Sequence, residues 1–114
     1  MSKRETPMQT LIPLAEKVAE KLKARKETLA VAESSAGGLI SAALLSVPGA
    51  SAYFLGGAVV YTMNARTSLM GITPADMEGV RASTEVYAMM LAEEACDRLG
   101  SDWAIAETGA TGPT

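Results

Sequence analysis

The fold prediction for this chain starts from the stretch AVAESSAGG at residues 30–38. A short apolar run ends abruptly at Glu33, and two serines, an alanine and two glycines follow. Residues 104–112 repeat the pattern as AIAETGATG, with an apolar run, a glutamate, a hydroxyl and glycine. Such a stretch is typical of a strand that turns into a loop at its carboxyl end. The echo therefore predicts parallel strands at 28–32 and 103–107, whose two loops face one cleft at the same edge of a sheet.

The rest of the chain alternates between helix and strand patterns. Apolar residues at helical spacing predict helices, and short apolar runs predict strands. The expected helices span 11–22, 37–45, 64–70 and 84–99, and the expected strands span 28–32, 58–61 and 103–106. We expect Thr10, Asn64 and Ser83 to cap three of the helices, Pro13 to lie in a first turn, and residues 1–9 to form a tail. Alternating strands and helices predict an α/β fold with a sheet covered on both faces.

The composition excludes several classes of protein. The 114 residues suffice for one domain, and 48% hydrophobic with 20% charged residues is typical of a globular chain. A net charge of −3 argues against a nucleic acid partner. No apolar run reaches the roughly 20 residues that span a bilayer, and the polar start lacks a secretory signal, so we expect a cytoplasmic protein. The single Cys96 lies in a helical pattern, which favours an inert thiol over a nucleophile.

Missing residue types restrict the chemistry further. The sequence has no histidine, which excludes a Ser-His-Asp triad and a His-ligated metal, so we expect neither a metal nor a cofactor. All five lysines lie within residues 3–26, mostly on the polar face of the first expected helix. A catalytic base must then come from Glu, Asp, Tyr, one of those lysines or an activated water. Because the chain ends as a loop leaves a strand, we expect this single domain to continue beyond residue 114.

The two echo loops are candidates for a binding site. Glycines at a helix start leave free amides that suit an anion, and small residues let a ligand approach the backbone. Carboxylates and hydroxyls would then project into one cleft and suit a phosphorylated, hydroxyl-rich ligand such as a nucleotide; the residues concerned are Glu33, Ser34, Ser35, Gly37, Gly38, Glu107, Thr108 and Gly109. The alternative is a tight turn in which Ser34 or Ser35 only caps a helix.

A third contribution is expected from residues 59–66, VVYTMNAR. Tyr61 ends the expected strand, and Arg66 lies in the following helix. A positive charge beside a cleft tyrosine would lower its pKa, because it favours the phenolate. The alternative is a tyrosine at a strand end with an arginine on the surface.

At these residues the chain resembles the CinA carboxy-terminal domain family of nicotinamide-nucleotide amidohydrolases. The resemblance runs from the first helix to the last residue and rests on AESSAGG at 32–38, VPGASAYFLGGAVVYT at 47–62, LMGI at 69–72, STEV at 83–86 and TGATGP at 108–113. It implies a three-layer α/β/α fold with a mixed, mostly parallel sheet. It also implies hydrolysis of the carboxamide of nicotinamide mononucleotide to nicotinic acid mononucleotide and ammonia, with Ser34 as the nucleophile. We expect a stand-alone member of the family, without the amino-terminal domain of full-length CinA proteins.

The chain departs from the family pattern at three places, one of which is the late loop ETGATGPT at 107–114, where the family is usually richer in glycine. Ser35 and Ala36 stand where the family commonly has Cys and Thr, and Arg66 stands where it has the lysine that pairs with the serine. Arginine stays protonated, so it cannot be the base. Two functions follow from this: an amidohydrolase with Ser34, Tyr61 and Arg66 as catalytic residues, or a catalytically weak paralogue that binds a nucleotide without hydrolysing this amide. The oligomeric state stays open, a homo-oligomer included.

Overall fold

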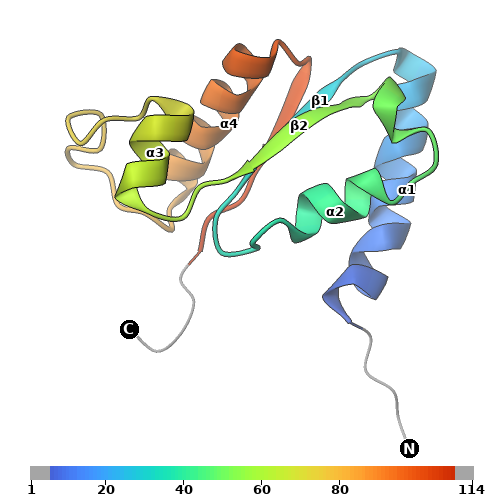
Figure 1. The fold of residues 1–114 in the computed structure, drawn as a ribbon, viewed down its shortest axis with the longest axis horizontal. Coiled ribbons are helices and arrows are strands. Elements are labelled where there is room, and N and C mark those ends of the chain that lie inside the picture. The colour runs from blue at the N-terminus through green and yellow to red at the C-terminus, as the bar shows by residue number, and fades with distance from the viewer. Residues whose placement is uncertain (1–5, 110–114) are drawn as a thin grey trace, which may run out of the picture.

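A computed structural model describes residues 6–109 of the chain. The helices are α1 (Pro7–Arg25), α2 (Leu39–Leu45), the short 3-10 helix η1 (Ala50–Ala52), α3 (Met63–Met70) and α4 (Glu85–Leu99). The strands are β1 (Leu29–Glu33), β2 (Phe54–Val59) and β3 (Trp103–Ala106). Figure 1 shows α1 and α2 on one face of the sheet and α3 and α4 on the other, so the fold is a three-layer α/β/α arrangement.

The described sheet is parallel throughout and has the order β2-β1-β3. Leu29 pairs with Trp103 at the start of β1, and Ala32 pairs with Ala106 near its end. The prediction from the sequence echo that these two strands run parallel is confirmed. Because β1 is central and all three strands run in one direction, the loops that follow them meet at one edge of the sheet.

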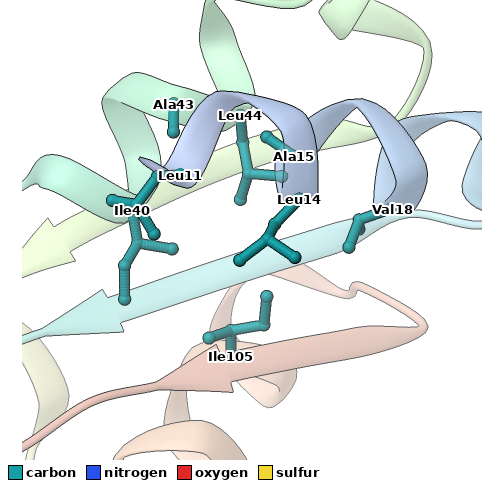
Figure 2. Close-up of a pocket in the computed structure, with 8 residues that line it drawn as sticks. All are labelled: Leu11, Leu14, Ala15, Val18, Ile40, Ala43, Leu44 and Ile105. Carbon is teal, nitrogen blue, oxygen red and sulfur yellow. The ribbon is translucent and has the colours of Figure 1, made fainter. Parts of the chain in front are cut away.

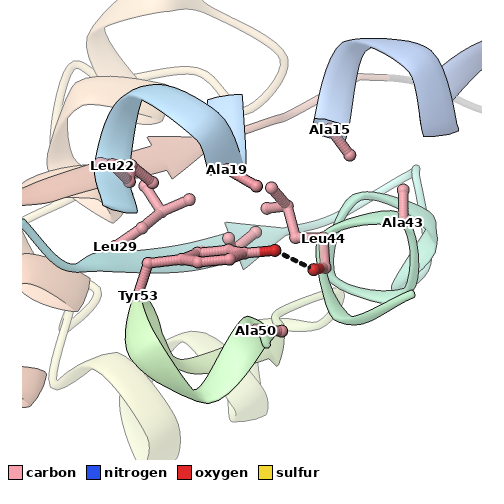
Figure 3. Packing of buried hydrophobic residues seen from close by; sticks show 9 residues of the cluster. Ala15, Ala19, Leu22, Leu29, Ala43, Leu44, Ala50 and Tyr53 are labelled. Carbon is pink, nitrogen blue, oxygen red and sulfur yellow. Dashed lines mark hydrogen bonds between the residues drawn. The ribbon is translucent and has the colours of Figure 1, made fainter. Parts of the chain in front are cut away.

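Successive side chains of β1 point to opposite faces of the sheet, so the strand contributes to two separate hydrophobic cores. Leu29 and Val31 pack toward α1 and α2, where they join a buried cluster with Ala15, Ala19, Leu22, Ala43, Leu44, Ala50 and Tyr53. In that cluster the buried hydroxyl of Tyr53 donates a hydrogen bond to the carbonyl of Leu44, which ties η1 to α2 (Figure 3). Ala30 and Ala32 face the other way, because successive side chains of a strand alternate. They pack with Val60, Met70, Ile72, Tyr87, Leu91 and Ala95.

The first helix begins earlier than the sequence pattern predicted. Thr6 is the N-cap, because its side chain accepts from the amide of Gln9 while the Gln9 side chain accepts from the amide of Thr6. This capping box places Pro7 in the first turn and Pro13 inside the helix. The expected cap at Thr10 and the tail over residues 1–9 are therefore wrong from Thr6 onward, and residues 1–5 lie outside the described range.

Three further boundaries differ from expectation. Strand β2 begins at Phe54, so the two glycines expected to precede the strand lie within it. A Cβ on Gly57 would collide with the hydroxyl of Ser41 on α2, so glycine there allows that helix to pack on the strand. Thr62 and Thr84, rather than Asn64 and Ser83, cap α3 and α4, each accepting from an amide three residues on.

No helix within residues 6–109 combines the length and the apolarity needed to cross a membrane.

Candidate functional site

The candidate site lies where the three parallel strands end. The amide of Val60 donates to the carbonyl of Glu33 at 2.7 Å, and the amide of Glu107 donates to the carbonyl of Ala32 at 3.0 Å. These bonds continue the strand pairing by one residue on each side of β1. The segments that begin at Ser34, Tyr61 and Thr108 therefore leave the sheet at the same edge.

Glu33 is fully buried at the end of β1 and binds the start of α2. It has the parity of Leu29 and Val31, so its side chain projects toward α2. One carboxylate oxygen accepts from the amides of Gly38 at 3.2 Å and Ile40 at 2.9 Å, and the other accepts from Ser41 at 2.9 Å. A carboxylate at a helix start satisfies amides that the helix itself leaves unpaired. Glu33 thus caps α2 from the adjacent strand.

Both amides of the glycine turn have partners within the protein. The amides of Gly37 and Gly38 were expected to hold a phosphate or an oxyanion, but Gly37 donates to the carbonyl of Ser34 and Gly38 donates to Glu33. The protein's own carboxylate occupies the place of an anion at this helix start. Both glycines have positive φ angles, +64° and +102°, so they provide the left-handed turn that connects Ser34 to α2. Their role as substrate contacts stays a prediction.

Glu107 connects the two echo loops. One of its oxygens accepts from the amides of Ser34 and Ala36, both at 2.9 Å. The other oxygen accepts a short hydrogen bond from the hydroxyl of Ser35. One carboxylate from the loop after β3 therefore holds three consecutive residues of the loop after β1, and the prediction that both loops face one site is confirmed.

The electrostatics of Glu107 favour its ionised form. Partial burial by itself raises the pKa of this carboxyl. Hydrogen bonds from the Ser35 hydroxyl and from the amides of Ala36 and Ser34 outweigh that effect, so the pKa is lower than the usual value of 4.5. Glu107 is consequently a carboxylate at neutral pH.

The loop after β3 also contacts the start of α4. The hydroxyl of Thr108 accepts from the amide of Ser83 at 3.2 Å. Ser83 has a φ of +60°, an uncommon conformation for a residue with a side chain. Gly109 lies against Ser35, because a Cβ at position 109 would lie 2.7 Å from the Ser35 hydroxyl oxygen. The rest of the TGATGP motif, 110–113, lies outside the described residues.

Tyr61 and Arg66 follow β2, but the contacts of Arg66 lead to the interior. Tyr61 is 63% exposed and leaves the sheet one residue after Val60. The Arg66 Nε donates to the hydroxyl of the buried Tyr87 at 3.0 Å, and its guanidinium carbon lies 4.8 Å from the centre of that ring. Arg66 therefore braces α3 against α4, and its expected effect on Tyr61 stays a prediction.

The sequence reasoning did not predict the contacts of Glu107 and Tyr87. Glu107 was placed in the cleft, but its position between the two loops was not predicted. Strand parity carried a signal, because Ile105 packs toward α1 and α2 and Glu107, two residues later, shares that side. No sequence signal connects Tyr87 to Arg66, since that contact depends on how α3 and α4 pack.

An apolar groove lies away from this edge. It has a volume of about 190 Å³ and is formed by α1, α2 and β3; its lining residues are Leu11, Leu14, Ala15, Val18, Ile40, Ala43, Leu44 and Ile105 (Figure 2). All of these side chains are aliphatic, so the groove offers no group for acid, base or nucleophilic chemistry. Within the described range, no three Asp, Glu or Cys side chains converge as metal ligands would.

Sequence comparison gives one family. The profile of the CinA C-terminal domain matches residues 11–114. A CinA-like protein of Picosynechococcus is 43% identical over 96 residues, which are 84% of this chain and 23% of that protein. A CinA-like protein of Gloeobacter violaceus is 45% identical over 86 residues, or 75% of this chain and 20% of the relative. The chain thus spans about a quarter or less of these curated relatives.

Comparison with solved structures gives the same family. A CinA superfamily protein from Escherichia coli superimposes with a TM-score of 0.85 at 27% identity, covering 97% of this chain and 64% of that one. The competence/damage inducible protein CihA from Agrobacterium tumefaciens gives 0.84 at 29% identity, covering 100% and 67%.

Proposed function

Because the chain belongs to the CinA C-terminal domain family, we propose that it acts as an amidohydrolase on nicotinamide mononucleotide. Water replaces the carboxamide nitrogen, and the products are nicotinic acid mononucleotide and ammonia. This reaction belongs to cytoplasmic salvage of pyridine nucleotides. The substrate is a small nucleotide, consistent with a chain whose net charge of −3 does not favour nucleic acid.

The observation that carries the proposal is the meeting of hydroxyls and a carboxylate at one sheet edge. Ser34 and Ser35 follow β1, and Glu107 follows β3 and binds both residues. Hydrolysis of an amide through a covalent intermediate requires a nucleophile, an adjacent proton acceptor and an orienting group for that acceptor. In this hydrogen-bonded set, Glu107 holds the loop that carries the two candidate hydroxyls.

The family resemblance assigns the attack on the amide carbon to Ser34, with Tyr61 as the proton acceptor. In this assignment Arg66 contributes charge only, because its guanidinium stays protonated at any working pH. The contact between Arg66 and Tyr87 favours the second candidate function, a weak paralogue that binds the nucleotide without hydrolysing its amide. An arginine held in this way cannot replace the amine base of the family.

Ammonia release decides between the two functions. The complete natural protein is incubated with nicotinamide mononucleotide, and ammonia is measured by a coupled dehydrogenase assay. The amidohydrolase proposal expects ammonia in proportion to nicotinic acid mononucleotide. Calorimetric binding of the nucleotide without ammonia release supports the weak paralogue, and absence of both contradicts both candidates.

A further inference from the structure

Two adjacent serines follow β1, and Glu107 binds them through different groups. It accepts a hydrogen bond from the backbone amide of Ser34 at 2.9 Å, whereas it accepts one from the side-chain hydroxyl of Ser35. The carboxylate thus engages the hydroxyl of Ser35 and not that of Ser34. From this difference, and resting on the proposed amide hydrolysis, we infer that Glu107 is a positioning residue, which fixes the turn so that Ser34, rather than Ser35, presents its hydroxyl to the substrate.

The backbone of Ser34 is held at both of its polar groups. Its amide donates to one oxygen of Glu107, and its carbonyl accepts from the amide of Gly37 at 3.1 Å. The amide of Ala36 donates to the same Glu107 oxygen at 2.9 Å, which fixes the far side of the turn. Rotation about the Cα–Cβ bond is then the freedom that remains to the Ser34 hydroxyl, and it has three staggered positions. Glu107 therefore restricts where the Ser34 oxygen can lie.

Ser35 is held back by the same carboxylate. A serine hydroxyl has one proton, and that of Ser35 is directed at the second oxygen of Glu107. The backbone at Gly109 lies against this hydroxyl, because a Cβ there would come within 2.7 Å of its oxygen. To attack a bound amide, the Ser35 hydroxyl would have to leave both contacts.

Glu107 is better suited to hold the turn than to accept a proton. Partial burial raises its pKa, but the hydrogen bonds from the turn outweigh that effect, so the pKa lies below the usual value. A general base is most effective when its pKa lies near the operating pH, so this carboxylate is a weak one. Hydrogen bonds to an ionised acceptor are roughly twice as strong as neutral ones, so the same charge makes Glu107 a firm anchor.

The turn itself requires an anchor of this kind. Gly37 and Gly38 both have positive φ, and residues without a Cβ allow many backbone conformations. Glu33, the other carboxylate of this edge, accepts from three amides at and after Gly38 and so holds the start of α2. Glu107 is the carboxylate that binds the part of the loop with the two hydroxyls.

Ammonia release by variants of the complete protein tests the positioning role. Glu107→Ala removes the acceptor of all three bonds, and kcat should fall about 10²-fold, the loss that a misplacement of about 1 Å can cause. KM should change little, because Glu107 acts through Ser34 and not on the substrate. Glu107→Gln keeps an oxygen for the two amides and presents an NH₂ donor to the Ser35 oxygen, so kcat should stay within about tenfold of the natural value. A general base would lose as much activity in Glu107→Gln as in Glu107→Ala.

Covalent labelling adds a measurement that does not depend on the substrate. Diisopropyl fluorophosphate forms a phosphoester with an activated serine, with loss of fluoride and of the serine proton, and peptide mass spectrometry locates the adduct. We expect the adduct on Ser34, formed about 10²-fold more slowly in Glu107→Ala.

Two further variants keep the result interpretable. Ser35→Ala retains both amide bonds to Glu107, so Ser34 should be labelled at a rate within about tenfold of the natural one, which tests the inference even if Glu107→Ala folds poorly. Glu20→Gln, at an exposed position of α1, should behave like the natural protein in both assays.

The outcomes separate the positioning role from the proposed function. Unchanged kcat in Glu107→Ala, equal losses in Glu107→Gln and Glu107→Ala, or an adduct on Ser35 would each overturn the inference, while ammonia release by the natural protein would retain the function. An adduct on Ser34 with the expected order of variants but without ammonia would support the positioning role and reject the substrate. A natural protein that gives neither ammonia nor an adduct would reject both.

Discussion

Replacing the buried carboxylate Glu33 should cost much of the stability of this domain. Its two oxygens accept three backbone amides at 2.9–3.2 Å, and the residue has no exposed surface. In Glu33→Gln, the amide oxygen can keep the bonds from Gly38 and Ile40, but its NH₂ group then faces the donor of Ser41. The loss is one charge-assisted hydrogen bond, about 1.5–3 kcal/mol, with a donor left facing a donor.

Glu33→Ala removes all three acceptors. Each buried amide left without a partner costs about 1–3 kcal/mol, so the total is roughly 3–9 kcal/mol. Domains of this size have a free energy of unfolding of about 5–15 kcal/mol. We therefore expect Glu33→Gln to fold with reduced stability and Glu33→Ala to be largely unfolded.

Urea denaturation followed by circular dichroism measures the effect. With a urea dependence of about 1–3 kcal/mol per molar, Glu33→Gln should lower the midpoint by roughly 0.5–3 M at unchanged slope. Glu20→Gln makes the same chemical change on the exposed face of α1 and should change stability by less than about 0.5 kcal/mol. If Glu33→Gln is as stable as this control, the three amides have other partners and the reasoning is wrong.

Four further outcomes follow from the contacts described above. Because the pKa of Glu107 is lower in the folded protein, its stabilising contribution is complete above the usual value of 4.5 and is lost as pH falls through the folded value. Urea titrations at several pH values should then show the stability gap between the natural protein and Glu107→Gln narrowing in acid, and a constant gap would contradict this. Gly109→Ala should lower the free energy of unfolding by about 1.5–3 kcal/mol in urea denaturation, because a Cβ at position 109 displaces the Ser35 hydroxyl from its hydrogen bond to the Glu107 carboxylate; an unchanged stability would show that this bond contributes little. Arg66→Lys should leave the rate of ammonia release nearly unchanged if Tyr61 is the base, whereas a gain of about 10²–10⁴-fold would assign that role to an amine. Tyr87→Phe, which removes the hydroxyl that Arg66 contacts, should lower the free energy of unfolding by about 1–3 kcal/mol in thermal and urea melts, and no change would show that the contact is weak.

Local sequence predicted most elements of the fold and the edge of the sheet at which the candidate site lies. Apolar runs that stop at Glu33 and Glu107 identified β1 and β3, and their similarity predicted a parallel pair with both loops on one side. Helical spacing located α2, α3 and α4 to within one or two residues. These features were predictable because periodicity and turn chemistry depend on residues close together in the chain.

Tertiary structure decided which group each carboxylate binds. Local sequence presents Glu33 and Glu107 as equivalent, yet one caps α2 from beneath and the other crosses to residues 34–36. That difference depends on the register between β1 and β3 and on where α2 packs over the sheet.

The early start of β2 and the contact of Arg66 with Tyr87 have the same origin. Gly57 lies in a strand because Ser41 of α2 needs the space above it, and Arg66 reaches Tyr87 because α3 packs beside α4. Such contacts join residues far apart in the chain, and their geometry is determined only once helices and strands have packed together. The sequence by itself therefore determined at which edge of the sheet the two polar loops lie, and the packed structure determined which hydroxyl meets which carboxylate.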